Sequence, residues 1–315
     1  MSIACGIDIG TNSFRLLVAE VQDGRLRPVA HELVTVRLGE GLWRSGRLSP
    51  AAMIRAEAAL GRFAATMASY SLHSVRICAT HAVRTAANSR EFLQRATSVT
   101  GLRVEVLSGE EEARLALLGV LSALPAEAQR RHPLVMVDVG GGSTEIMRQA
   151  VPSSEPRVIS LPVGAVGLTE EFSANYQGMR TKIRSILAPS LQRIIGKETA
   201  GQDSLLVGSG GTVTSLAALA LDLTSYDAGQ VQNYVLSQAV LDSLLARLTA
   251  LLPEERNGLP GLAEGRGEII VAGAVVLQEL QRALACTSLL ASDAGLLEGI
   301  LLSGVEKRHR SGDPS

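Results

Sequence analysis

The sequence predicts a two-domain α/β protein in which each domain is built on a mixed sheet. The chain has 315 residues, of which 46% are hydrophobic and 3% aromatic, enough for two aliphatic cores. Strand-like apolar runs alternate with helix-like segments. A strand–turn–strand pattern near the N-terminus recurs 130 residues later, so that Asp8 matches Asp138, Gly10 matches Gly140 and Ser13 matches Ser143. This match indicates an internal duplication, with one copy in each half.

The first half is predicted to begin with two strands joined by a hairpin turn and to continue with alternating helices and strands. Ser49 followed by Pro50 is typical of a helix start, with Ser as the N-cap and Pro in the first helical position. Asn88 and Glu91 have the spacing of a capping box for the next helix. The predicted strands lie at residues 3–9, 14–21, 74–80 and 102–108.

A polar, turn-rich segment that starts at Pro125 separates the two halves. We therefore expect domains at residues 1–125 and 126–315. The second half repeats the opening pattern around Asp138 and then becomes mostly helical. It ends with an apolar helix at 269–280 and a strand followed by a final helix within 288–302.

Composition excludes several classes of protein. Lys and Arg number 30 and Asp and Glu 31, so the net charge is -1, unlike that of a nucleic-acid coat or a polybasic membrane binder. The cysteines Cys5, Cys78 and Cys286 are odd in number and form no C-x-x-C motif, which argues against a disulfide framework or a zinc knot. The N-terminal segment is unlike a signal peptide, and we expect a cytoplasmic protein with no membrane or nucleic-acid partner.

Three glycine-rich turns follow apolar strands: DIGTNS (8–13), DVGGGST (138–144) and GSGGT (208–212). The N–H groups of such turns bind phosphate oxygens, although a single glycine turn is more often only structural. A carboxylate beside a phosphate cradle is explained if a divalent cation lies between them. Asp8, Asp138 and Glu145 are therefore candidate Mg²⁺ ligands.

Two further features admit both a structural and a functional interpretation. The run Glu110–Glu111–Glu112 opens a helix, where acidic residues suit the helix dipole, and one of the three would be available to hold an attacking water. Arg84 follows a predicted strand, either as a surface residue or as a bidentate phosphate ligand.

Together these motifs resemble the exopolyphosphatase/guanosine pentaphosphate phosphatase family, within the sugar kinase–heat-shock protein–actin superfamily. The matching segments run in family order over nearly the whole chain and include GIDIGTNSFRLLVAEV (6–21), EVLSGEEEARLALLGV (105–120), VDVGGGSTEI (137–146) and GSGGTVTSLAAL (208–219). The resemblance implies two actin-like (ribonuclease H-like) domains with an interdomain cleft.

The resemblance also assigns roles to individual residues. Glu112 matches the glutamate that orients the attacking water, and Asp138 and Glu145 match acidic residues implicated in metal binding or water activation. The implied phosphate- and substrate-binding residues are Asn12, Ser13, Arg84, Gly140, Gly141, Gly142, Ser143, Gly210, Gly211 and Thr212. The chain departs from the family pattern at Gly167, where arginine is common, and at Arg266–Gly267–Glu268, where the family has Arg-Ala-Asp.

The expected function is that of a Mg²⁺-dependent phosphohydrolase that releases terminal orthophosphate from inorganic polyphosphate. Guanosine pentaphosphate is a second expected substrate, guanosine penta- or tetraphosphate an expected ligand, and a homodimer the expected assembly. Two alternatives stay open, a small-molecule kinase of the same superfamily and a non-catalytic protein that binds the guanosine alarmone. Phosphate release from polyphosphate, guanosine pentaphosphate and ATP distinguishes the three.

Overall fold

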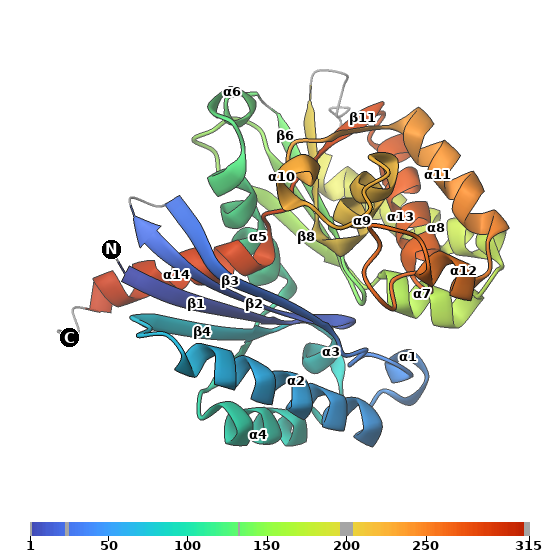
Figure 1. Ribbon diagram of the computed structural model, residues 1–315. Helices are drawn as coiled ribbons and strands as arrows, with labels where there is room; N and C mark the ends of the chain where they lie inside the picture. The colour runs from blue at the N-terminus through green and yellow to red at the C-terminus, as the bar shows by residue number, and fades with distance from the viewer. Residues whose placement is uncertain (1, 23–24, 132, 196–203, 312–315) are drawn as a thin grey trace. The chain divides into compact units, whose positions relative to one another are not determined.

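The computed structural model describes residues 2–22, 25–131, 133–195 and 204–311 and is shown in Figure 1. Contacts within the chain divide it into two units. Unit 1 comprises Met1–Ser122 and Gly295–Ser315, and unit 2 comprises Ala123–Ala294. Each unit contains one mixed sheet, as the sequence predicts.

The sheet of unit 1 has the strand order β3-β2-β1-β4-β5. The pairs β1–β2 and β2–β3 are antiparallel, whereas β1–β4 and β4–β5 are parallel. The sequence pattern does not predict β3, because this edge strand is largely exposed and includes Pro28. The strands are β1 (Ser2–Ile9), β2 (Ser13–Gln22), β3 (Arg25–Thr35), β4 (Ser74–Ala79) and β5 (Val104–Val106).

Helices cover both faces of this sheet. Figure 1 shows α2 and α4 side by side on one face, where Leu60, Phe63 and Phe92 are buried against Ile7 of the sheet. On the other face, α14 packs on β1 and β2 through Leu297 and other apolar side chains. The helices of unit 1 are α1 (Leu42–Ser45), α2 (Pro50–Ala68), α3 (His81–Thr85), α4 (Ser89–Thr100), α5 (Gly109–Ala123) and α14 (Leu296–Ser311).

Both predicted helix starts are confirmed, but the predicted capping box at Asn88 is wrong. Ser49 caps α2, accepting a hydrogen bond from the N–H of Ala52 at 3.1 Å, and Pro50 occupies the first turn. Asn88 precedes α4, but its side chain makes no cap hydrogen bond. It instead bonds both the N–H and the C=O of Leu48, at 2.9 and 3.0 Å. A long-range contact thus replaces the local one.

The sheet of unit 2 has the order β10-β11-β9-β6-β7-β8. Five of its strands, β8-β7-β6-β9-β11, repeat the arrangement β3-β2-β1-β4-β5 of unit 1. The strands follow each other along the chain in the same order, and neighbouring pairs are parallel or antiparallel at the same places; β10 is added at the edge. The predicted duplication is therefore confirmed. The strands are β6 (Leu134–Val139), β7 (Thr144–Gln149), β8 (Arg157–Leu161), β9 (Leu205–Ser209), β10 (Val235–Ser237) and β11 (Ser288–Ala291).

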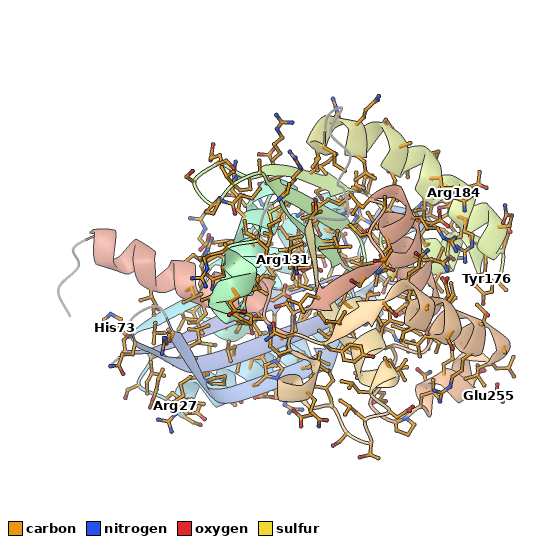
Figure 2. All side chains as sticks on the ribbon, turned by 90° about the horizontal axis from the view of Figure 1, so that it is seen from above. Arg27, His73, Arg131, Tyr176, Arg184 and Glu255 are labelled. Atoms are coloured by element: carbon orange, nitrogen blue, oxygen red, sulfur yellow. The ribbon has the colours of Figure 1, made fainter. Side chains whose placement is uncertain are left out.

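A buried carboxylate joins two helices of unit 2. Glu279 of α13 is 3% exposed and accepts hydrogen bonds from Arg180 and Arg184 of α8 and from Arg282; Figure 2 labels Arg184. Burial raises the pKa of Glu279, but the two α8 arginines outweigh it, and the pKa lies below its ordinary value. The helices are α6 (Ala126–Gln129), α7 (Ala165–Phe172), α8 (Tyr176–Ile195), α9 (Gly210–Ala220), α10 (Ala228–Val231), α11 (Gln238–Ala250), α12 (Pro253–Asn257) and α13 (Ile270–Ala283).

The structure differs from the expected division into 1–125 and 126–315 at the end of the chain. Unit 2 ends at Ala294, and the last helix returns to the sheet of unit 1. The reason is a close approach of α14 to α5. A Cβ built on Gly119 would overlap the carbonyl of Gly295, and one built on Gly299 would overlap the carbonyl of Leu115. Local sequence patterns carry no information on such a distant partner.

No helix of the described segments is long and apolar enough to cross a membrane. Cys5, Cys78 and Cys286 are buried and form no disulfide within these segments, and burial raises the pKa of Cys5 to about 12.

The contact between α5 and α14 gives a test with a matched control. Gly119→Ala should lower the free energy of unfolding by roughly 1–3 kcal/mol, because the added methyl meets backbone that cannot move aside. Gly61→Ala, in the interior of α2 with its nearest non-local atom at 3.9 Å, should raise it by about 1 kcal/mol through helix propensity. Thermal unfolding of both variants measures the difference, and equal stability would contradict the close helix contact.

Candidate active site

The duplicated turns have the same backbone hydrogen bond. The N–H of Gly10 donates to the C=O of Ser13 at 3.2 Å, and the N–H of Gly140 donates to the C=O of Ser143 at 3.0 Å. The sequence match at an offset of 130 residues is therefore a match of conformation. The tight turn leaves the intervening amides directed away from the strands that flank it.

These intervening amides are available to a ligand. The N–H groups of Gly141, Gly142 and Ser143 donate to no acceptor among the described residues, and the same holds for Thr11 and Asn12 of the first turn. Buried or half-buried amides without acceptors are uncommon in folded proteins, and a run of them is typical of anion-binding turns. The geometry supports both turns as phosphate cradles.

In unit 2 the second and third glycine turns meet at one edge of the sheet. β6 and β9 are parallel neighbours, with Asp138 in register with Ser209. The Ser209 hydroxyl donates to Oδ2 of Asp138 at 2.9 Å, and the Thr212 hydroxyl donates to the C=O of Val139 at 2.9 Å. The sites predicted at 138–145 and 210–212 are thus brought together within this unit.

Asp138 and Glu145 are directly opposite each other on β6 and β7. Opposite residues of an antiparallel pair lie on the same face with Cβ atoms roughly 5 Å apart, so two carboxylates here repel each other unless a cation or a proton intervenes. Glu145 is 2% exposed, and its Oε1 accepts a hydrogen bond from Ser160 at 2.7 Å.

The matching pair in unit 1 is Asp8 and Arg15, which form a salt bridge of 2.7 Å. Arginine thus stands where unit 2 has a second carboxylate. Both bonds from Arg15 go to Oδ2 of Asp8, at 3.1 and 2.7 Å. The other oxygen, Oδ1, is buried and has no hydrogen-bond donor in the described part of the chain. Asp8 therefore keeps one oxygen that a cation would satisfy.

These residues fit Mg²⁺ in the chemistry of their donors. Mg²⁺ prefers carboxylate oxygens and is commonly held by one or two carboxylates, water and substrate phosphate. Within the described segments no group of three or more His, Cys, Asp or Glu side chains is placed to hold a metal. A site that uses Asp138 and Glu145 would thus take its remaining ligands from water and phosphate.

The three glutamates at the start of α5 have different surroundings. Glu111 closes a capping box: its Oε2 accepts from the N–H and the hydroxyl of Ser108, both at 2.9 Å. Glu110 is exposed. Glu112 is 9% exposed and accepts a hydrogen bond from Arg84 at 2.9 Å. Arg84 also donates to the C=O of Leu107 at 2.7 Å, which fixes the guanidinium between α3 and α5.

The remaining predicted residues, and one that was not predicted, lie in or beside the glycine turns of their own units. Asn12 and Ser13 are buried in the first turn, where the Asn12 amide donates to the Ser13 hydroxyl at 3.2 Å. Arg266 was not predicted as a site residue, yet a Cβ on Gly211 would overlap its guanidinium. The available signal was the departure of the next two residues, Gly267 and Glu268, from the Arg-Ala-Asp pattern. A Cβ on Gly167 would meet nothing within 4 Å, so that position leaves open space.

The two sheets share one strand order, with β10 added in unit 2, and a glycine turn follows the first strand of each unit. This arrangement defines the actin-like (ribonuclease H-like) class. The model of the Ppx/GppA phosphatase family matches residues 17–308. Exopolyphosphatase 2 of Mycobacterium tuberculosis is 34% identical over 320 residues, which cover 94% of this chain and 97% of that protein. The chain therefore belongs to the Ppx/GppA phosphatase family.

Solved structures agree. A crystal structure of an exopolyphosphatase-like protein has a TM-score of 0.90 and 29% identity, covering 98% of this chain and 99% of that one. The family member from Aquifex aeolicus has a TM-score of 0.78 and 30% identity, with 98% of both chains covered.

His81, next to the Glu112–Arg84 pair, makes stability depend on pH. Burial first and then the Arg84 charge lower the pKa of His81 from 6.5 to about 4. Between these values the unfolded chain binds the proton and the folded chain does not, so stability falls as the pH drops from 6.5 towards 4. We expect a loss of about 2 kcal/mol between pH 7 and pH 5.

Urea unfolding of the wild type and of His81→Gln at both pH values measures this loss. The difference in stability between the two proteins should shift in favour of the variant at pH 5. A difference that is independent of pH would show that His81 titrates normally.

Proposed function

We propose that the protein is a Mg²⁺-dependent exopolyphosphatase that releases orthophosphate from the end of inorganic polyphosphate. Glu112 holds and deprotonates the attacking water. The amides of Gly141, Gly142 and Ser143 bind phosphoryl oxygens, and Asp138 and Glu145 bind the metal. Membership of the Ppx/GppA family and the similarity to an exopolyphosphatase support the choice of substrate.

The observation that carries the proposal is the buried pair of Glu112 and Arg84. The neighbouring Glu111 is occupied with capping its helix, which leaves Glu112 as the carboxylate suited to a general base. Arg84 orients this carboxylate and, as a planar cation, also suits a phosphate oxygen.

The turn in unit 2 supplies the complementary chemistry. Its amides donate to oxygens on which negative charge develops as the phosphoryl group is transferred. When bound, Mg²⁺ neutralises part of the charge on the phosphate oxygens. Arg266 adds a positive charge beside the third turn, at Gly211.

One assay separates hydrolysis from its rivals. Phosphate release is measured from polyphosphate, guanosine pentaphosphate and ATP with Mg²⁺, with and without a small-molecule acceptor. We expect release from polyphosphate without an acceptor. Phosphoryl transfer only with an acceptor would indicate a kinase, and binding without release would indicate a sensor. Activity on guanosine pentaphosphate and the homodimer stay predictions, to be tested by the same assay and by sedimentation.

Glu112→Gln should keep the fold and lose turnover. The side chain remains able to accept from Arg84, whereas removing a general base lowers kcat by about 10²–10⁴-fold. Glu111→Gln is the matched control, since glutamine also completes a capping box and kcat should change less than about threefold. Steady-state phosphate release by both variants measures this, and a larger loss in Glu111→Gln would reassign the base.

Asp138→Asn should weaken the binding of Mg²⁺ selectively. We expect the Mg²⁺ concentration for half-maximal activity to rise roughly ten- to hundredfold, since one anionic ligand is lost while the Ser209 hydrogen bond can persist. Chelation should abolish wild-type activity, and added Mg²⁺ should restore it. Asp222→Asn, an exposed carboxylate of the same unit, is the control. An unchanged Mg²⁺ titration in Asp138→Asn would exclude Asp138 as a metal ligand.

A further inference from the structure

A groove of about 760 Å³ lies in unit 1 between α4 and β5, the edge strand of the sheet. None of the residues to which a role is assigned above lines this groove. Its lining includes Arg90 and Thr97 of α4, Arg103 just before β5, and the strand itself.

The lining of the groove holds two arginines and one carboxylate, Glu105. The side chains of Arg90 and Arg103 make no hydrogen bond or ion pair with any residue that the structure describes. The carboxylate in the lining, Glu105, is held on its far side by Arg76 through two bonds of 3.0 and 2.9 Å. An anion in the groove thus meets two guanidinium groups and one neutralised carboxylate.

The strand edge adds backbone donors. The N–H of Leu107 donates to the C=O of Ala79 on β4 at 2.9 Å. Because successive N–H groups of a strand point to opposite sides, those of Val104 and Val106 point to the open edge. Both residues line the groove. The N–H groups at this edge can donate to phosphate oxygens, while the C=O groups beside them are left to water.

The lining of the groove runs along β5 to Val106, one residue before Leu107. The C=O of Leu107, directly after β5, accepts from Arg84, which in turn binds Glu112. Arg103 stands four residues earlier along the chain, roughly 13 Å away at the rise of an extended strand. Arg103 thus lies at one end of this strand segment, and the bond between Arg84 and Leu107 lies just beyond its other end.

We propose that this groove binds an extended phosphate chain and tethers inorganic polyphosphate whose end is processed at Glu112. The identity of the chain rests on the proposed function. A peptide strand would use the same edge amides but would leave both arginines without a counter-charge, so the observations favour a polyanion. Retention of long substrates then depends on Arg90 and Arg103.

Binding is measured on the full chain with Glu112→Gln as background, so that long polyphosphate is not consumed. Arg90→Gln/Arg103→Gln should weaken binding about tenfold, as expected for two exposed ionic contacts. The slope of log affinity against log salt concentration should shrink by about two, one for each lost phosphate contact. Thr97→Glu, which places a negative charge in the groove and removes no arginine, should weaken binding several-fold.

The control is Arg95→Gln/Arg27→Gln, which removes the same charge from unit 1. Arg95 pairs with Glu57 and Glu91, and Arg27, labelled in Figure 2, pairs with Glu20. The affinity of this control variant for polyphosphate should change less than about twofold. Equal affinity of the two double variants for polyphosphate would overturn the tether. So would a loss of affinity for single-stranded RNA without any loss of affinity for polyphosphate.

The two proposals fail separately. If the wild type releases no phosphate from polyphosphate but the groove variants still lose binding, the tether stands and the proposed function falls. If the wild type hydrolyses polyphosphate and the groove variants bind it normally, the proposed function stands and the tether falls.

Discussion

The site in unit 2 depends on how closely the backbone of one glycine turn approaches its neighbours. A Cβ built on Gly210 would overlap Oδ1 of Asp138, and one built on Gly164 would overlap the backbone of Gly141. Gly210 also has a backbone φ of 82°, which residues other than glycine seldom adopt. Because β6 and β9 are parallel neighbours, both turns emerge at the same edge and must share this space. The glycines let them do so while the amides of 141–143 remain available.

Duplication gave the two units the same turn and different charges. Position 15 in β2 and position 145 in β7 are equivalent, each paired with the aspartate that precedes the turn. In unit 1 the partner is Arg15, and a salt bridge neutralises most of the charge of Asp8. In unit 2 the partner is Glu145, and two carboxylates face the same side of the sheet. The partner of the aspartate is thus a cationic side chain in unit 1 and a second carboxylate in unit 2, and Oδ1 of Asp8 still has no donor in the described part of the chain.

The features that the sequence predicts correctly depend on residues near one another in the chain. The hairpin at 10–12, the cap at Ser49 and the glycine turns are of this kind, and the duplication follows from comparing two such local patterns. The features that it does not predict depend on distant partners. The side chain of Asn88 binds Leu48, the helix after Gly295 joins the first sheet, and Arg266 packs on Gly211. Nothing in the local pattern encodes these contacts.

The three glutamates of α5 show why a role cannot be read from local sequence. Successive helical residues point about 100° apart, so Glu110, Glu111 and Glu112 face three directions whatever their order. The sequence places all three in the first turn, where each would suit the helix dipole. A local capping box holds Glu111 at Ser108, tertiary packing buries Glu112 against Arg84, and Glu110 is exposed. A buried carboxylate held by a cation is poised for chemistry in a way that an exposed one is not, because its orientation is already fixed before a substrate arrives.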